Sequence, residues 1–179
     1  MRLQLPIDDT ARRSLRAGDE VLLSGVLLTA RDAAHERLAA LIKKGARLPV
    51  DLKDAAVYYC GPTPARPGAA IGACGPTTSS RMDAFAPALI GKGVRVMIGK
   101  GDRSVEVKRA IRKHGCVYFI ATGGLGALLS TRVTSARVIA YKDLGTEAIH
   151  RLTVVDFPVL VGIDTKGRDV YGTAERKRQ

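Results

Sequence analysis

The stretch RVMIGKGDRSVEVKRAIRKHGCVYFIATGGLGALLS, residues 95–130, decides the fold class. Its apolar runs predict strands at 95–99 and 116–121, and its helical spacing predicts helices at 102–113 and 123–130. Strand–helix–strand units of this kind build parallel sheets with right-handed crossovers. The stretch therefore predicts an α/β protein with a parallel section.

The sequence before this stretch continues the same alternation. An apolar run at 21–28 predicts a strand, with a bend or a close approach where Ser24-Gly25 interrupts it. RDAAHERLAALIKKG, residues 31–45, predicts a helix that Gly45 ends. A further strand is expected at 55–59, before a turn-rich segment.

Between these two regions the pattern is less regular. We predict a short strand at 69–73. The small polar residues 75–81 suit a helix N-terminus, and we expect residues 82–93 to continue that helix, although Pro87 interrupts its pattern.

After residue 130 the sequence is mainly β, with Lys166-Gly167 as a hairpin turn. Short strands are predicted at 136–140, 149–155, 159–163 and 169–171. We find no repeat or linker and therefore predict a single layered α/β domain over residues 1–179 that ends in a basic tail at 174–179.

The overall composition is that of a globular protein with a strong excess of cations. Of 179 residues, 46% are hydrophobic and 26% are charged, which excludes disordered and fibrous classes. A net charge of +12 favours an anionic partner, and a basic nucleic-acid-binding domain is the alternative from a different class. Aromatic residues make up only 4% and the basic residues are scattered, so we expect no nucleic-acid partner.

Cysteine and histidine spacing argues against a metal site held by this chain alone. The three cysteines are far apart in sequence and form no CxxC pair, and the three histidines have no ligand spacing. The N-terminal residues contain no apolar run of signal-peptide length, and nowhere do about 18 uncharged apolar residues follow one another. We therefore expect a cytoplasmic protein without a membrane partner.

Polar residues accompany glycines in several loops at the ends of predicted elements. Arg31 can offer a planar fork to a carboxylate, or pair locally with Asp32 or Glu36. Hydroxyl groups at 77–80 can bind an anion or simply cap a helix, and Lys100 projects from a Gly-Lys-Gly turn. Taken together, such groups suit a pocket for a small dicarboxylate, because two carboxylates need two clamps at a fixed separation.

The glycines of TGGLGALL do not form a nucleotide-binding loop. They lack both the GxGxxG spacing and the Lys-Ser/Thr pair of a P-loop. Close packing of the backbone at a helix start is the interpretation that we favour.

Several segments, in this order, closely resemble one known family. They are LRAGDEVLLSGVLLTARDAAHERL, GPTTSSRMD, MIGKGDRS, TGGLGALLS and YKDLGTEAIHRLTVVDFPVLVGIDTKG, and the resemblance extends from about Leu15 to Tyr171. The family is that of the β subunits, or C-terminal domains, of class I iron–sulfur hydro-lyases, which include fumarate hydratase and L-tartrate dehydratase. The resemblance implies a swivelling β/β/α domain.

The resemblance also implies roles for particular residues. Arg31, Arg81 and Lys100 would bind the substrate carboxylates, and Thr77 is the candidate base. Asp32, His35 and Thr78 would support these residues without contacting the substrate. Many family members have a glycine before the motif arginine, whereas this chain has Ser79-Ser80 there.

In this family an α subunit holds a [4Fe–4S] cluster through three cysteines, so this chain would be half of an enzyme that works only with that subunit. An even assembly such as α2β2 is expected from symmetry. The implied reaction is the hydration of fumarate to L-malate, and L(+)-tartrate dehydratase and mesaconate hydratase remain as alternatives.

Overall fold

The computed structural model describes residues 1–172, so the predicted basic tail at 174–179 lies outside the described part. In chain order the elements are β1 (Arg2–Gln4), α1 (Asp9–Ser14), β2 (Glu20–Thr29), α2 (Asp32–Lys43), β3 (Ala56–Tyr58), the 3₁₀ helix η1 (Ser79–Met82), α3 (Ala86–Gly91), β4 (Val96–Gly99), α4 (Val105–His114), β5 (Val117–Ile120), α5 (Gly126–Ser130), β6 (Val133–Ala140), the 3₁₀ helix η2 (Lys142–Glu147) and β7 (Ile149–Ile163).

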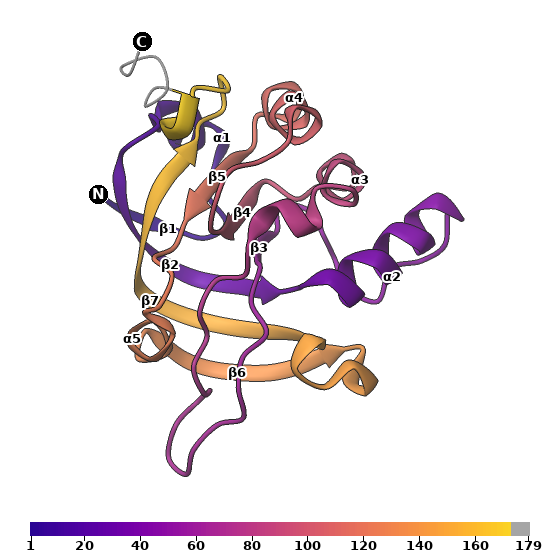
Figure 1. Ribbon diagram of the computed structural model, residues 1–179, viewed down its shortest axis with the longest axis vertical. Coiled ribbons are helices and arrows are strands. Elements are labelled where there is room, and N and C mark those ends of the chain that lie inside the picture. The colour runs from indigo at the N-terminus through magenta and orange to yellow at the C-terminus, as the bar shows by residue number, and fades with distance from the viewer. Residues whose placement is uncertain (173–179) are drawn as a thin grey trace.

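These strands form one seven-stranded sheet that closes on itself. Its order is β1-β2-β3-β4-β5-β7-β6, and β7 also pairs with β2. Strands β1 to β5 pair with one another in parallel, whereas β7 runs antiparallel to β2, β5 and β6. Figure 1 shows α2, α3 and α4 together on one side of the parallel strands. The predicted α/β class, with a parallel section followed by a β-rich part, is confirmed.

The strands bury both of their faces, so their side chains divide between two cores. On β4, Val96 and Ile98 face the inside of the closed sheet, whereas Met97 packs beneath the helices. On β5, Phe119 faces inward and Tyr118 faces the helices. This division follows from the two-residue period of a strand. It also explains why the parallel strands are continuous apolar runs in the sequence.

Strand β7 is continuous where two strands, 149–155 and 159–163, were predicted, so that prediction was wrong. The strand absorbs the interruption as a bulge: its pairing with β2 shifts between Leu23 and Gly25, the position of the predicted bend. Asp156 has a φ of 49° there and donates its N–H to the Ser24 hydroxyl. Pro158 lies opposite Leu22, which donates its own N–H to the Met1 carbonyl just before β1, so the missing N–H of the proline interrupts no bond with β2.

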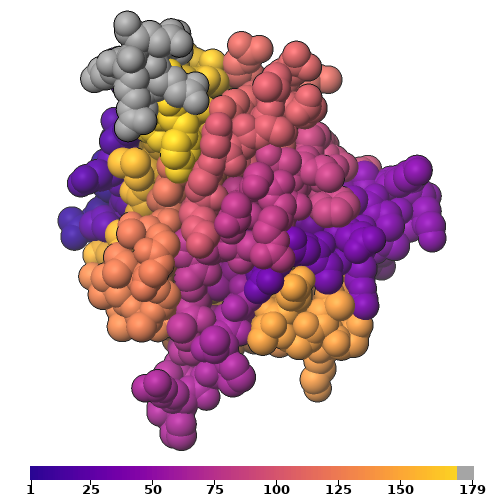
Figure 2. Space-filling view, viewed as in Figure 1, coloured from indigo at the N-terminus to yellow at the C-terminus, as the bar shows by residue number. Residues whose placement is uncertain are grey.

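Three other sequence predictions were also wrong. Residues 69–73 form bends and irregular structure instead of a strand, in a segment that projects from the molecule (Figure 2). The helix expected to continue from 75–81 through 82–93 is split into η1 and α3, because Pro87 suits only the first turn of a helix. At 169–171 only Asp169 bridges to Ile163, and the chain then turns helical.

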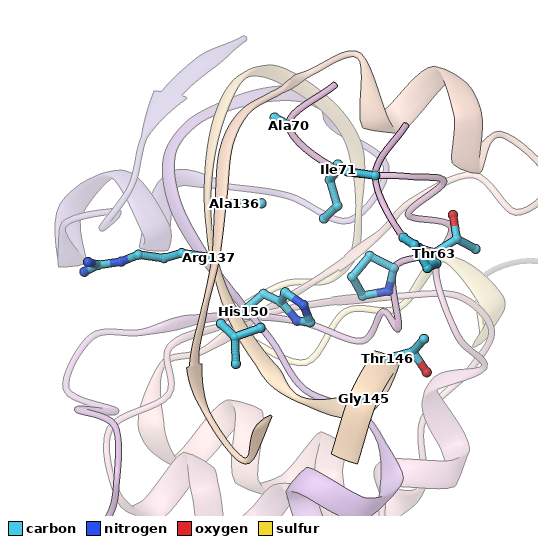
Figure 3. Close-up of a pocket in the computed structure, with 12 residues that line it drawn as sticks. Thr63, Ala70, Ile71, Ala136, Arg137, Gly145, Thr146 and His150 are labelled. Carbon is cyan, nitrogen blue, oxygen red and sulfur yellow. The ribbon is translucent and has the colours of Figure 1, made fainter. Parts of the chain in front are cut away.

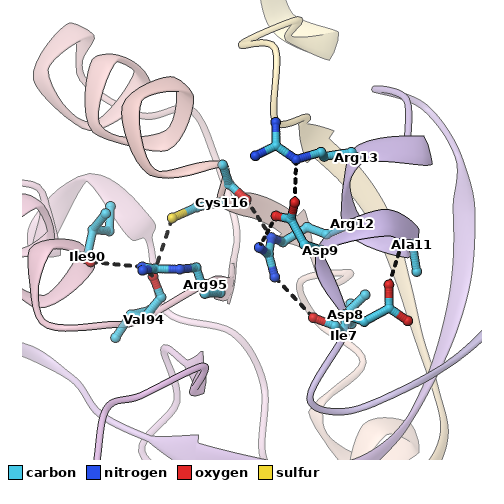
Figure 4. Close-up of polar contacts among 11 residues, drawn as sticks. Ile7, Asp8, Asp9, Ala11, Arg12, Arg13, Ile90, Val94, Arg95 and Cys116 are labelled. Atoms are coloured by element: carbon cyan, nitrogen blue, oxygen red, sulfur yellow. Dashed lines mark hydrogen bonds and ion pairs between the residues drawn. The ribbon is translucent and has the colours of Figure 1, made fainter.

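Part of the positive charge is used within the fold. Arg12 of α1 is buried and donates to the carbonyl groups of Ile7 and Gly115, while its guanidinium pairs with Asp9 (Figure 4). Through these contacts α1 is attached to the turn between α4 and β5. Arg12 is therefore a structural cation and is not available to an external anion.

Candidate functional site

The predicted site residues lie where the parallel strands end. Arg31 follows β2 and Lys100 follows β4, and the carboxyl ends of parallel strands are the usual place for binding groups in α/β proteins. Thr77 is tied to the same edge because its N–H donates to the carbonyl of Tyr59, just after β3, at 2.6 Å. Loops from separate parts of the sequence thus meet at one end of the sheet.

The segment with the hydroxyl groups runs alongside the Lys100 turn. The Lys100 N–H donates to the Thr77 carbonyl at 3.3 Å, and the Ser79 N–H donates to the Lys100 carbonyl at 2.9 Å. Thr78 pairs with Lys100 as a parallel bridge. The backbone therefore fixes Thr77 and Lys100 side by side.

Thr77 is half-buried, and within residues 1–172 its hydroxyl forms no hydrogen bond with another side chain. The Lys100 side chain is exposed and extends past Gly123, where an added Cβ would lie 3.4 Å from its Cδ. Thr78 is exposed at the start of η1. The three side chains are thus available at the surface of the strand ends.

Arg81 forms a two-pronged ion pair with Asp32. Its Nε lies 2.9 Å from Asp32 Oδ1 and its Nη2 lies 2.7 Å from Asp32 Oδ2. The Arg81 side chain is 50% exposed and that of Asp32 is 32% exposed. The pair joins η1 to the start of α2, so Asp32 orients the arginine, and Nη1 forms no hydrogen bond within residues 1–172.

Arg31 is held by a carboxylate that sequence reasoning missed. Its Nη2 lies 3.2 Å from Glu147 Oε1, whereas its Nε lies 3.7 Å from Asp32. Glu147 also accepts the N–H of Ala33 at 3.0 Å and so caps α2. Only the antiparallel pairing of β7 with β2 brings Glu147 to this helix, and no local sequence pattern indicates it.

His35 lies beneath this surface and braces the first turn of α2. Its Nδ1 is 2.9 Å from the carbonyl oxygen of Arg31, and its ring packs edge-on against Tyr59 at 5.2 Å. Burial lowers the pKa of His35 to about 4, so the ring is neutral at pH 7. A neutral, fully packed ring suits a supporting position.

Two glycines permit close packing of the loops. An added Cβ at Gly126 would lie 2.8 Å from the backbone nitrogen of Gly75, and the Cys74 N–H donates to the Gly126 carbonyl. An added Cβ at Gly99 would clash with Ser79. The interpretation of TGGLG as a place of close backbone packing is confirmed.

The cysteines do not come together as ligands of an iron–sulfur cluster. Cys60 and Cys74 belong to the core inside the closed sheet, whereas Cys116 is buried beneath the helices. Burial raises the pKa of Cys116 to about 11, which disfavours the thiolate that a metal needs. No group of three or more candidate ligands is found within residues 1–172, so the described residues do not fit a [4Fe–4S] cluster.

A separate hollow lies between the projecting segment and β6. Thr63, Ile71 and Thr146 surround it together with His150, and none of the predicted site residues lines it (Figure 3). It is therefore distinct from the carboxylate-binding candidates. None of the helices in the described part of the chain has the length and apolar character needed to cross a membrane.

Sequence comparison identifies the class to which this arrangement belongs. Residues 1–174 match the family described as Fumarase C-terminus, and the chain belongs to that family. The family predicted from the sequence motifs is thereby confirmed.

Individual relatives carry hydro-lyase names. The chain is 39% identical over 151 residues to "Fumarate hydratase class I, anaerobic" of Escherichia coli and 35% identical over 173 residues to "Fumarate hydratase 2" of Leishmania major. These matches cover 83% and 94% of this chain but only 28% and 30% of those relatives. The chain thus spans less than a third of their length.

A third relative is of similar length. The chain is 33% identical over 171 residues to "Putative L(+)-tartrate dehydratase subunit beta" of Methanocaldococcus jannaschii, covering 92% of this chain and 88% of that relative. A chain of this size therefore has a counterpart that is named as a separate subunit.

Proposed function

We propose that this chain is a single-domain β subunit of a heteromeric [4Fe–4S] hydro-lyase, namely a fumarate hydratase that interconverts fumarate and L-malate. The observation that carries the proposal is that Lys100 lies beside Thr77 at the end of the sheet where Asp32 contacts both Arg31 and Arg81. Family membership and the named relatives support the same reaction class.

The cations of this chain would bind the two substrate carboxylates. Asp32 occupies the Nε and Nη2 side of Arg81, which leaves Nη1 and the outer side of the fork for a substrate oxygen. Lys100 is exposed and has no carboxylate partner among the described residues, so it offers a full positive charge. Together these groups favour a dianion over a monoanion.

Thr77 is the candidate base that removes the C3 proton of malate at its Oγ1. A threonine hydroxyl ionises far above neutral pH, so this role requires strong positive charge or a proton acceptor close to the oxygen. Lys100 is fixed beside Thr77 by backbone bonds and supplies part of that charge. In this proposal Arg81 and the partner's cluster would supply the rest of that charge.

The cluster belongs to the partner in this proposal. Bound there by three cysteines, it would supply Lewis acidity toward the substrate oxygens. We place the complex in the cytoplasm, as an α2β2 or similar even assembly.

Tartrate is the second candidate substrate. The Methanocaldococcus jannaschii relative supports it, because that relative has nearly the same length and carries the tartrate dehydratase name. A pocket that grips two carboxylates does not by itself fix the substituents on the carbons between them, so substrate choice depends on pocket volume.

The test is anaerobic co-expression with the α subunit, followed by assays on malate, tartrate and mesaconate. We expect turnover by the complex and none by this chain alone. Turnover by the isolated chain would refute the proposed dependence on a partner. Tight, steeply salt-dependent binding of duplex DNA without any complex formation would favour the nucleic-acid alternative instead.

A further inference from the structure

A second, buried arginine–carboxylate pair lies in the two segments that carry Arg81 and Lys100. Arg103 Nε lies 2.7 Å from Asp83 Oδ1, with side-chain exposures of 0% for Arg103 and 11% for Asp83. The other oxygen, Asp83 Oδ2, accepts the N–H of Ser104 at 2.6 Å. Both carboxylate oxygens are therefore engaged with the segment that follows Lys100.

Aromatic side chains enclose the Arg103 guanidinium. Its central carbon lies 5.2 Å from the ring centre of Tyr59 and 5.0 Å from that of Tyr118. Its Nη1 donates to the Tyr59 hydroxyl at 3.3 Å, whereas its Nη2 has no hydrogen-bond partner within residues 1–172. The side chain is thus fixed by an ion pair, a hydrogen bond and two cation–π contacts.

This buried pair connects the two segments that carry candidate substrate cations. Asp83 stands two residues after Arg81, and Arg103 stands three residues after Lys100. Tyr118 adds a second connection, because its hydroxyl donates to the Gly101 carbonyl at 2.8 Å and lies 2.9 Å from Ser79 Oγ. The spacing between the Arg81 turn and the Lys100 turn is therefore set from below.

Holding two turns together with a buried ion pair carries a large desolvation free energy. Removing two charges from water costs several kcal/mol per ion, and apolar residues of similar volume often stabilise a fold equally well. Apolar packing is less directional than an ion pair that engages both oxygens of Asp83. The geometry of the two turns is what the pair fixes and what apolar substitutes would leave loose.

We propose that Arg103 is a positioning residue that, through Asp83, sets the separation of Arg81 and Lys100 and thereby selects four-carbon dicarboxylates. This inference rests on the proposed function. Arg103 does not touch the substrate: it is fully buried, and its effect reaches the substrate through the two turns.

The test uses the complete complex and the variants Arg103→Lys, Arg103→Met and the double variant Arg103→Met/Asp83→Leu. The double variant removes both charges and so avoids an unpaired buried carboxylate. We expect the KM for fumarate to rise about 10- to 100-fold in the methionine variants, with kcat changing much less, since a misplacement of about 1 Å is worth roughly a factor of 100. Arg103→Lys should recover part of that loss.

Length selectivity provides a readout that loss of stability would not change. Succinate and glutarate differ by one methylene, and we expect the wild-type complex to prefer succinate as an inhibitor. In the methionine variants the difference in inhibition between succinate and glutarate should become smaller. Unchanged KM and unchanged length preference in the folded double variant would overturn the proposal.

Arg12→Lys is the matched control, because Arg12 is also a buried arginine with an aspartate partner but belongs to α1. It should lower stability and leave KM unchanged. An equal rise in KM would reduce the Arg103 effect to general destabilisation and would also overturn the proposal.

Calorimetric titration with succinate separates this inference from the proposed function. If the wild-type complex binds succinate but turns over none of the candidate substrates, the hydro-lyase assignment fails, and the affinities of the variants still test Arg103. If the wild-type complex binds no dicarboxylate, the positioning role fails as well.

Discussion

Two arginine–aspartate pairs belong to the loops at the end of the sheet, and they differ in solvent access. Arg81–Asp32 is the outer pair, with side-chain exposures of 50% and 32%, and Arg103–Asp83 is the inner pair, with exposures of 0% and 11%. An exposed ion pair contributes little to stability, whereas breaking a buried one leaves an uncompensated charge. The outer pair is thus suited to binding a ligand and the inner pair to fixing the geometry of the loops.

The largest expected effect is on stability when the inner pair is broken. Arg103→Ala should reduce the free energy of unfolding by about 3–5 kcal/mol, because Asp83 stays buried without its partner. Arg81→Ala should reduce it by no more than about 1 kcal/mol. Urea denaturation of the two variants measures the difference, and similar values would contradict the contrast between the pairs.

The next largest effect is on catalysis when an outer cation is removed. In the complex, Arg81→Ala and Lys100→Ala should each remove about 2–4 kcal/mol of transition-state stabilisation, because the native side chains hold desolvated carboxylates. This loss corresponds to a fall in kcat/KM of roughly 30- to 1,000-fold. Arg37→Ala is the control, because this arginine also forms an exposed ion pair, with Asp143, and is not one of the predicted site residues. Rates near wild type would place Arg81 and Lys100 outside the site.

The stability of the protein should also depend on pH through His35, which is buried beside the inner pair. Burial, and to a lesser degree the charge of Arg103, lowers the pKa of His35 from 6.5 to about 4. The unfolded state therefore binds more protons below pH 6.5, so stability falls as the pH decreases and this contribution levels off below about pH 4. From pH 7 to pH 5 the His35 contribution should cost about 2 kcal/mol.

Unfolding of wild type and His35→Gln, measured across this pH range, isolates that contribution. The variant should lose less stability on acidification than the wild-type chain. Parallel curves for the two proteins would show that His35 does not titrate as its buried position requires.

The smallest expected effect concerns Glu147, which holds Arg31 from the side. Glu147→Gln keeps an oxygen for the Ala33 N–H but loses the charge that pairs with Arg31. We expect kcat/KM to fall roughly fivefold, which corresponds to a loss of about 1 kcal/mol of transition-state stabilisation. Glu36→Gln is the control, since Glu36 is exposed on α2, the helix that Glu147 caps. An equal fall in kcat/KM for Glu36→Gln would contradict a special role of Glu147.

Much of the exposed binding surface around the outer pair could be predicted from the sequence, because the positions of its residues follow from local sequence patterns. Arg31 and Asp32 begin a helix after a strand, and Lys100 stands in a glycine turn after another strand, so period and turn residues place them at strand ends. The resemblance to a family added the roles of Thr77 and Arg81, and these roles remain predictions. The same local rules failed for β7, where a bulge carries the strand through a proline that normally marks an interruption.

The inner pair, Arg103–Asp83, could not be predicted in this way. Arg103 belongs to the GKGDRS segment, but as a charged residue before a helix it is expected at the surface. Its burial depends on Tyr59 just after β3, on Tyr118 of β5 and on Asp83 from another loop. None of these residues is near it in sequence.

By itself, the sequence determined the strand and helix periodicity, the α/β class, the family and the set of cations that follow the strands. Only the tertiary structure decided which carboxylate holds each cation and which pair is buried. The physical reason is range: periodicity and capping act over a few residues of chain, whereas ion-pair partners and desolvation depend on which distant segments the closed sheet brings together. In this chain that closure, through β7, brings Glu147 to Arg31, and the parallel order of β3, β4 and β5 encloses Arg103.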